Sequence, residues 1–154
     1  MAHVPELLDL GLPFIGQALA ASAVSFRTKE IIILRTSAIL QCRYCIDSHT
    51  PVALDSGLTH AEVRALRTEP GTSIESAFAN ETDQALIAWV DAVAGGRGAI
   101  PEPVNHLVAQ HFAPHEIVEL TLTTTVTMLL NRYATSLQLP VGASTLARLA
   151  KEGF

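Results

Sequence analysis

Apolar residues recur at helical spacing along most of this chain, and this periodicity is what most restricts its fold. Between residues 82 and 94, for example, Leu86, Trp89, Val90 and Val93 fall on one face of a helix. Glycine and proline separate the periodic segments, as is typical of connections in a helical protein. Segments that alternate apolar and polar residues, as a strand does, are sparse. The sequence therefore predicts an all-α fold.

Seven segments are expected to be helical: residues 5–20, 28–40, 42–55, 59–67, 82–94, 101–112 and 114–138. Gly11 and Pro13 are expected to break or kink the first segment, and Gly57 is expected to end the third. Thr28 is positioned to cap the second helix, and Thr59 has the spacing of a capping box at the start of the fourth. We expect a single helical domain of about six or seven helices over residues 1–154.

Two of these segments have features of strands. Residues 31–34 are apolar and mostly β-branched, and residues 120–128 alternate leucine or valine with threonine. Helix is favoured for both, because strands that could pair with them are missing elsewhere. In addition, Ile117, Leu120 and Thr124 fit the i, i+3 and i+4 spacing of a helix.

The composition restricts the partners of the chain. Hydrophobic residues make up 49% of it and charged residues only 16%, so part of its apolar surface is expected to face another subunit. The net charge of -5, without a lysine or arginine cluster, argues against nucleic acid and acidic membranes. The chain opens without a signal-peptide pattern, and no apolar run reaches the ~18 residues of a membrane span. A cytoplasmic location is therefore expected.

The only two cysteines form the motif Cys42-Arg43-Tyr44-Cys45, and His49 follows four residues later. Thiols at this spacing can close a disulfide ring, and an imidazole at i+4 lies on the same helical face as the second thiol. The start of a helix and a nearby imidazolium both favour the thiolate, which is the reactive form. Two cysteines are too few for a disulfide scaffold. The motif therefore indicates redox chemistry, with Cys42, Cys45 and His49 as candidate catalytic residues.

Two other interpretations of the motif stay open. In the first, Cys42 and Cys45 are simply small apolar residues buried in the core, as free cysteines often are. Zinc is the second alternative, since the two thiols and His49 offer three ligands, with Glu30, His60 or another subunit as the fourth.

Known cofactor-binding patterns are absent from the sequence. A thioredoxin fold is excluded, because its cysteine motif follows a strand in a βαβ unit. No glycine-rich phosphate loop follows a strand, so neither flavin nor nicotinamide is indicated. We expect the chemistry to need no cofactor.

Spacing alone does not connect Glu30 with the cysteine motif. If the second and third helices were straight and antiparallel, Glu30 would lie ~18 Å from the turn and His49 only ~10 Å. The position of Glu30 in the sequence fits an exposed carboxylate at the start of a helix as well as it fits a residue of the site.

Taken together, Glu30, Cys42-x-Tyr44-Cys45 and His49-Thr50 resemble the alkylhydroperoxidase D-like branch of the carboxymuconolactone decarboxylase superfamily. The likeness continues through residues 53–58, 62, 116–120 and 131–132. It implies an all-helical fold assembled as homotrimers or homohexamers. It also implies a peroxidase or disulfide reductase that is reduced by a dithiol, for example that of a lipoylated protein.

The resemblance assigns roles to four residues. Glu30 and His49 relay a proton from Cys45, the thiolate attacks a peroxide, and Cys42 resolves the sulfenic acid as a disulfide. Tyr44 stands where a characterised member has a second histidine, and this difference bears on the relay rather than on reversible dithiol chemistry.

Two further functions are compatible with the sequence. One is lactone decarboxylation, the other activity of the superfamily, which does not use a cysteine pair. The other is a non-enzymatic helical oligomer whose Cys/Cys/His site binds a metal or senses oxidants.

Overall fold

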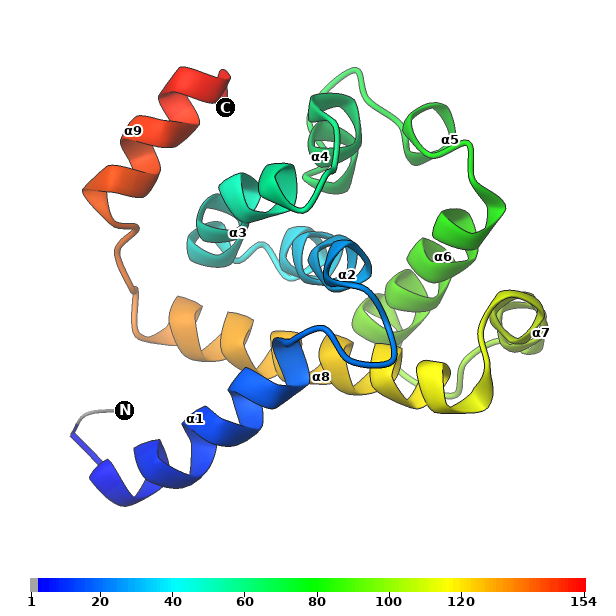
Figure 1. The fold of residues 1–154 in the computed structure, drawn as a ribbon, viewed down its shortest axis with the longest axis horizontal. Coiled ribbons are helices and arrows are strands. Elements are labelled where there is room, and N and C mark those ends of the chain that lie inside the picture. The colour runs from blue at the N-terminus through cyan, green and yellow to red at the C-terminus, as the bar shows by residue number, and fades with distance from the viewer. Residues whose placement is uncertain (1–2) are drawn as a thin grey trace.

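The computed structural model describes residues 3–154, which form nine helices and no strand (Figure 1). The helices are α1 (Pro5–Leu19), α2 (Phe26–Ile39), α3 (Arg43–Asp55), α4 (His60–Leu66), α5 (Ile74–Ala77), α6 (Glu81–Gly95), α7 (Glu102–His111), α8 (Pro114–Ser136) and α9 (Ala143–Glu152). The all-α prediction is confirmed. The helix count exceeds the prediction because α5 and α9 were not expected.

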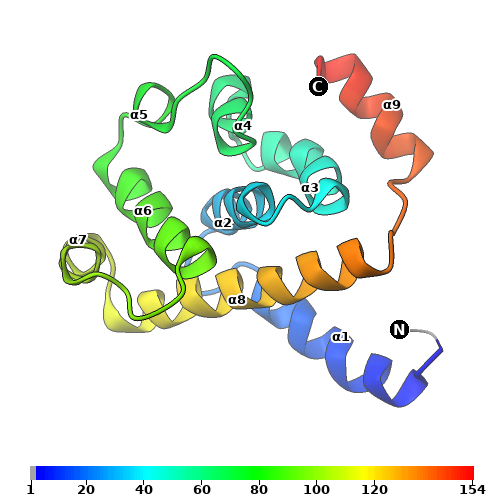
Figure 2. The same ribbon diagram turned by 180° about the vertical axis from the view of Figure 1, so that it is seen from behind.

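Helix α2 lies at the centre of the fold. In both ribbon views α8 runs along one side of α2, while α3 and α4 cover the other (Figures 1 and 2). Residues 31–34 are buried within α2 and belong largely to the hydrophobic core. The strand alternative for this segment is therefore wrong, and its apolar character on all sides reflects a helix that is surrounded.

Two ion pairs fix the direction of α6 against α2. Arg27 contacts Asp83 at 2.9 Å, and Arg35 contacts Asp91 at 2.5 Å. The two arginines are eight residues apart on α2 and the two aspartates eight residues apart on α6. Because both helices rise by about 1.5 Å per residue, α2 and α6 run in the same direction in constant register.

Helix α8 follows α2 in the same way. Lys29 Nζ lies 3.0 Å from Thr123 Oγ1, and Ser37 Oγ lies 3.0 Å from Asn131 Nδ2, again eight residues apart on both helices. This register brings the C-terminal part of α8, around Asn131, against the C-terminal end of α2, where the cysteine motif begins.

The threonine-rich segment 120–128 lies within α8, as predicted. Its strand-like alternation is compatible with a helix because the threonine hydroxyls are satisfied internally. Each donates to the carbonyl four residues earlier in the same helix, as in Thr121, Thr123, Thr124, Thr125 and Thr127. Threonines can therefore be buried against α2 without leaving unpaired hydroxyls.

Two details of the first helices differ from the prediction. Helix α1 continues through Gly11 and Pro13, so the expected break is wrong. A proline removes one backbone hydrogen bond, and in a largely exposed helix water can bind the carbonyl left free. Helix α2 starts two residues earlier than expected, because Ser25 rather than Thr28 is its cap and accepts the Thr28 N–H at 3.1 Å.

The predicted boundaries around α3 and α4 are confirmed. Gly57, just beyond the end of α3, has a φ of 98°, in the left-handed region that favours glycine. Thr59 and Glu62 form the expected capping box, since the Glu62 carboxylate accepts the Thr59 N–H at 2.7 Å and Thr59 Oγ1 accepts the Glu62 N–H at 3.2 Å.

The C-terminal helix α9 returns to pack against α3. Arg148 on α9 contacts Asp55 at the end of α3 at 2.6 Å. The ring of Phe154 lies below the guanidinium groups of Arg64 and Arg67, at 4.7 and 5.0 Å. Only one side chain of α9 is buried. Leu146, Leu149 and Ala150 have the i, i+3 and i+4 spacing of a helix, so the sequence carries a periodic signal for α9 that the prediction did not include.

Among residues 3–154, none of the helices combines the length and the apolar character needed to cross a membrane.

Candidate active site

Cys42 joins α2 to α3 through its main chain. Its N–H donates to the Ser37 carbonyl at 2.9 Å, and the preceding residue Gln41 donates to the Ala38 carbonyl at 3.1 Å. Gln41 has a φ of 54°, so these two bonds form a Schellman motif that ends α2. The Cys42 carbonyl accepts the Ile46 N–H at 3.0 Å and opens α3. Cys42 is thus the N-cap of α3, and the second cysteine lies in its first turn.

The two cysteines are free thiols in contact with each other. Their sulfur atoms are 2.9 Å apart, whereas the bond of a disulfide is about 2.05 Å long. Cys42 is fully buried, while Cys45 keeps 6% of its surface exposed. A small molecule reaching this pair from outside therefore meets Cys45 first.

The environment of Cys45 disfavours its thiolate overall. Burial raises the pKa of Cys45 to about 12, and the adjacent Cys42 sulfur contributes to this increase. Hydrogen bonds from the side chains of Asn131 and Ser37 act in the opposite direction and lower the pKa. A helix start favours the thiolate, whereas burial, the largest of the effects on the pKa of this thiol, disfavours it. Cys45 needs a base to become a nucleophile.

Glu30 and His49 form a hydrogen-bonded pair next to the motif. His49 Nδ1 lies 3.0 Å from Glu30 Oε2 and 3.3 Å from Oε1. The carboxylate is only 1% exposed, so the interpretation of Glu30 as an exposed residue is wrong. With Nδ1–H donating to Glu30, the second ring nitrogen, Nε2, is left unprotonated and able to accept a proton.

The antiparallel arrangement assumed for α2 and α3 is also wrong. Both ribbon views show α2 nearly end-on while α3 lies across the view, so the two axes are inclined to each other (Figures 1 and 2). Because the axes are inclined and both side chains are long, Glu30 and His49 come into contact although their distances from the turn differ.

His49 lies one helical turn beyond Cys45, on the same side of α3. Within residues 3–154 no hydrogen bond joins the His49 ring directly to the Cys45 sulfur. Proton transfer between them therefore needs a bridging water molecule or a rotation of the imidazole.

Sequence reasoning missed two polar residues at the cysteines. Ser37 from α2 and Asn131 from α8 are buried beside the cysteines, and their hydrogen bonding lowers the pKa of Cys45. Asn131 falls within the family likeness but was not predicted to belong to the site, and no local pattern marks Ser37. Tyr44 packs against the same cluster together with Ala134 of α8, so the tyrosine of the motif is a neighbour of the thiols.

A buried aspartate anchors α3 between the second cysteine and the histidine. Asp47 contacts Arg43 at 2.5 Å and Arg67 of α4 at 3.7 Å. Arg67 also donates to Thr50 Oγ1 at 2.6 Å. Because Arg67 additionally contacts Phe154, this arginine connects the helix that carries the thiols with the end of the chain.

The candidate fourth zinc ligands, Glu30 and His60, make other contacts. In the part of the chain that the structure describes, no group of three or more His, Cys, Asp or Glu side chains could hold a metal ion. Glu30 is paired with His49, and His60 stacks on Phe154 with ring centroids 5.6 Å apart.

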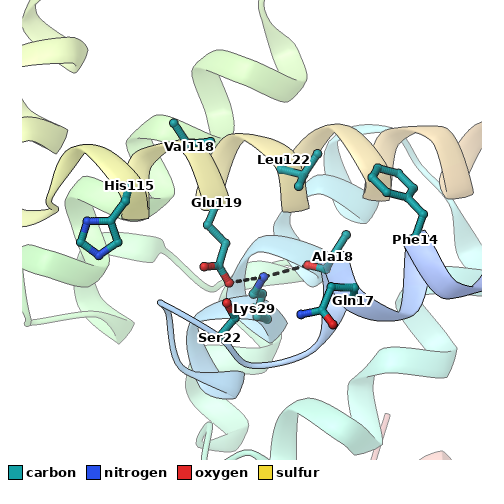
Figure 3. A pocket seen from close by; sticks show the side chains of 9 residues that line it. All are labelled: Phe14, Gln17, Ala18, Ser22, Lys29, His115, Val118, Glu119 and Leu122. Carbon is teal, nitrogen blue, oxygen red and sulfur yellow. Dashed lines mark hydrogen bonds and ion pairs between the residues drawn. The ribbon is translucent and has the colours of Figure 1, made fainter.

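A cavity of about 250 Å³ lies between α1, α2 and α8, with Lys29 and Glu119 at its base (Figure 3). The cysteines, Glu30 and His49 do not line it. Lys29 is fully buried, and its Nζ contacts Glu119 at 2.6 Å, the Ala18 carbonyl at 2.8 Å and Thr123 at 3.0 Å. Burial raises the pKa of Glu119, but the hydrogen bonds from Lys29, the Ala23 N–H and Ser22, together with the charge of Lys29, outweigh this effect and the pKa is lowered. All three hydrogens of the ammonium are thus used in holding α1 and α2 to α8.

Residues 5–89 match the model of the Carboxymuconolactone decarboxylase family, and the chain belongs to this family. The matched segment includes the whole of α2 and α3, and therefore Glu30, both cysteines and His49. A search of curated proteins gave no match.

Three solved structures share the fold. One, from Agrobacterium tumefaciens, is a protein of unknown function that has been suggested to be the antioxidant defence protein AhpD, with a TM-score of 0.78, 23% identity and coverage of 92% of this chain and 94% of that one. The second, from Ralstonia eutropha JMP134, is an uncharacterized peroxidase-related protein described as an alkylhydroperoxidase AhpD core. Its TM-score is 0.80 at 18% identity, over 94% of this chain and 75% of that one.

The third is the debrominase Bmp8, a cysteine-to-alanine variant in complex with 2,3,4-tribromopyrrole. Its TM-score is 0.76 at 17% identity, over 98% of this chain and 79% of that one. The resemblance to alkylhydroperoxidase D-like proteins is confirmed at the level of family and fold.

Proposed function

We propose that this protein is a dithiol oxidoreductase that reduces peroxides or disulfides. The observation that carries the proposal is the contact of two free thiols, 2.9 Å apart, beside a buried Glu30–His49 pair. Thiol chemistry needs a nucleophile, a base and a resolving thiol, and these side chains provide all three. The peroxidase-related and antioxidant descriptions of two proteins with the same fold are consistent with this proposal.

The first step is attack by Cys45, the more exposed of the two thiols. His49, oriented by Glu30, accepts the thiol proton through Nε2. The thiolate attacks an oxygen of the hydroperoxide, so that an S–O bond forms and the O–O bond breaks. The leaving alkoxide takes up the proton and departs as an alcohol, and Cys45 remains as a sulfenic acid.

The second step is intramolecular. The Cys42 thiol attacks the Cys45 sulfur, water leaves, and a disulfide forms. An external dithiol, such as that of a lipoylated protein, returns the pair to two thiols by disulfide exchange and is itself oxidised. With a disulfide as substrate, Cys45 attacks sulfur instead of oxygen and the same Cys42–Cys45 disulfide results.

A homo-oligomer, as a trimer or a hexamer, is part of the proposal. The outer face of α8 carries exposed Val118, Leu122 and Leu129, and exposed Phe14 of α1 adjoins Val118 and Leu122. Contiguous apolar residues of this kind are typical of surfaces between subunits. We propose that this outer α8 face, defined by these four residues, is covered by another copy of the chain.

Stopped-flow oxidation of the reduced protein tests the proposed activity. The panel comprises alkyl hydroperoxides, hydrogen peroxide, small disulfides and 2,3,4-tribromopyrrole, the compound bound by the debrominase with the same fold. We expect rapid loss of both thiols and an intramolecular disulfide by mass spectrometry with a peroxide or a disulfide. A reaction with the bromopyrrole alone would reassign the substrate class.

Three further assays address the other functions. Lactone decarboxylation by a Cys42→Ser, Cys45→Ser double variant would identify a lyase that does not need the thiols. Bound metal in the purified protein, without reaction toward any oxidant, would favour a metal-binding oligomer. Stoichiometric oxidation without turnover by any dithiol would favour a sensor.

A further inference from the structure

Two buried polar side chains next to the cysteines are not used by the proposed mechanism. Ser37 lies near the C-terminal end of α2, where its carbonyl accepts the Cys42 N–H at 2.9 Å, and Asn131 lies on α8, three residues before Ala134, which packs with both cysteines. Both residues are buried, and Asn131 Nδ2 lies 3.0 Å from Ser37 Oγ. Asn131 and Ser37 therefore form one buried cluster with the cysteines, and hydrogen bonding by these two side chains lowers the pKa of Cys45.

The hydrogens of this cluster follow from its donors and acceptors. Asn131 Nδ2 carries two hydrogens, and one of them goes to Ser37 Oγ. A hydroxyl that accepts this bond still has its own hydrogen, which Ser37 can donate to the sulfur of Cys45. The second amide hydrogen of Asn131 can do the same. Neither group can take the thiol proton, and donors of this kind favour the thiolate over the thiol.

The oxygen of the Asn131 amide supports a role at the sulfur. Oδ1 is buried and has no hydrogen-bond partner among the residues that the structure describes. Buried polar atoms without a partner are rare in folded proteins. An asparagine that served only to tie α8 to α2 would be expected to bond through both ends of its amide. Here only the nitrogen end is bonded, to Ser37 Oγ.

We propose that Asn131 and Ser37 are catalytic residues that stabilise the negative charge on the Cys45 sulfur when the thiolate forms. This inference rests on the proposed thiol chemistry and assigns separate roles in it to two pairs of residues. The Glu30–His49 pair removes the proton, and the Asn131–Ser37 pair stabilises the charge left behind. Donors fixed in advance are effective here because burial keeps competing water away.

The titratable groups around this sulfur lie on α2 and α3. Helix α2 contributes Glu30, and α3 contributes His49 and Tyr44 together with Cys42 at its N-cap. Helix α8 contributes Asn131 and Ala134, neither of which titrates. A change in pH profile caused by replacing the asparagine therefore reports on the environment of the sulfur and not on the loss of a titrating group.

The test measures the ionisation of Cys45 directly. In a Cys42→Ser background, which leaves one thiol, alkylation by iodoacetamide is followed as a function of pH. Asn131→Ala and Ser37→Ala should each slow alkylation about tenfold near neutral pH and move the profile to higher pH, as expected for a lost hydrogen bond to a charged group. Thr124→Val is the matched control, because Thr124 is buried on α8 and its hydroxyl bonds to its own helix.

Each outcome decides the inference. An unchanged profile in both test variants would overturn it, and so would an equal shift in the Thr124→Val control. A shifted profile in a protein that reduces no peroxide or disulfide would support the inference while rejecting the proposed function, since alkylation requires only the thiolate. If one variant fails to fold, the other decides, because Asn131 and Ser37 reach the sulfur from different helices.

Discussion

Replacing Glu30 by glutamine would test the proton relay without opening a cavity. The carboxylate is buried and accepts the His49 Nδ1–H at 3.0 Å, and an amide of the same shape would offer a neutral acceptor instead. A hydrogen bond to a charged group contributes about 1.5–3 kcal/mol, and here its full value is reached only when His49 has taken the proton. At about 1.4 kcal/mol per factor of ten, Glu30→Gln should slow the oxidation of Cys45 by about 10- to 100-fold near neutral pH.

The assay is stopped-flow oxidation of the reduced protein by excess hydroperoxide over a range of pH. The loss should shrink at high pH, where the thiol ionises without the relay. Asp47→Asn is the matched control: this buried carboxylate lies on α3 but contacts Arg43, so its loss should lower the free energy of unfolding and leave the pH dependence unchanged. A Glu30→Gln variant as fast as the wild type would refute the relay. Independent, multiplying losses in a double variant with His49→Ala would refute it as well, because a relay acts as one unit.

Four other predictions concern the thiols, the buried lysine and the assembly. Cys42→Ser should accumulate a sulfenic acid on Cys45 after one equivalent of peroxide, whereas Cys45→Ser should lose the fast phase; the reverse pattern in mass spectrometry and stopped flow would make the first cysteine the nucleophile. In the wild type, alkylation of Cys45 should rise with pH through the neutral and mildly alkaline range, because its pKa is raised to about 12, and a plateau near neutral pH would contradict that environment. Lys29→Met removes one partner of a buried ion pair and should lower the free energy of unfolding by about 3–5 kcal/mol in urea titrations, with partial recovery when Glu119→Gln is added; no recovery would mean that the pair is not coupled. Leu129→Glu should lower the mass measured by light scattering, and a wild-type protein that is already monomeric at micromolar concentration would contradict the oligomer.

The sequence predicted those helices whose apolar spacing is regular and whose ends are marked by local chemistry. Helices α6, α7 and α8 lie within two residues of their expected bounds, and the capping box at Thr59 was recognisable because both partners are local. Helix α5 has only four residues, too few for a periodic pattern. Helix α9 does carry the i, i+3 and i+4 spacing of a helix, but the contacts that place it against α3, such as that of Arg148 with Asp55, join residues far apart in the sequence. Local patterns predict single helices, whereas contacts between distant residues are not visible in such patterns.

The same distinction between local patterns and distant contacts applies to the residues of the site. Cys42, Cys45 and His49 lie within eight positions of one another, so spacing on one helix was enough to associate them. Asn131 is 94 positions from Ser37, and only the shared register of α2 and α8 brings the two together.

The pKa of the Cys45 thiol could not be predicted from the sequence for a related reason. The favourable effect of a helix start is visible in the sequence. The opposing effect of burial depends on which other helices cover the site, and it is the largest effect that raises the pKa of this thiol.

The joint between α2 and α3 has an evolutionary consequence. Main-chain atoms of Cys42 close one helix and open the next, and its sulfur takes no part in either bond. The turn therefore depends on the main chain at this position and the chemistry on the side chain. Another side chain can replace the thiol without breaking the two main-chain hydrogen bonds that form the turn. A lineage can gain or lose thiol chemistry here by single substitutions without losing its fold on the way. Such a turn is compatible with a family that is named for a decarboxylation and shares its fold with peroxidase-related proteins.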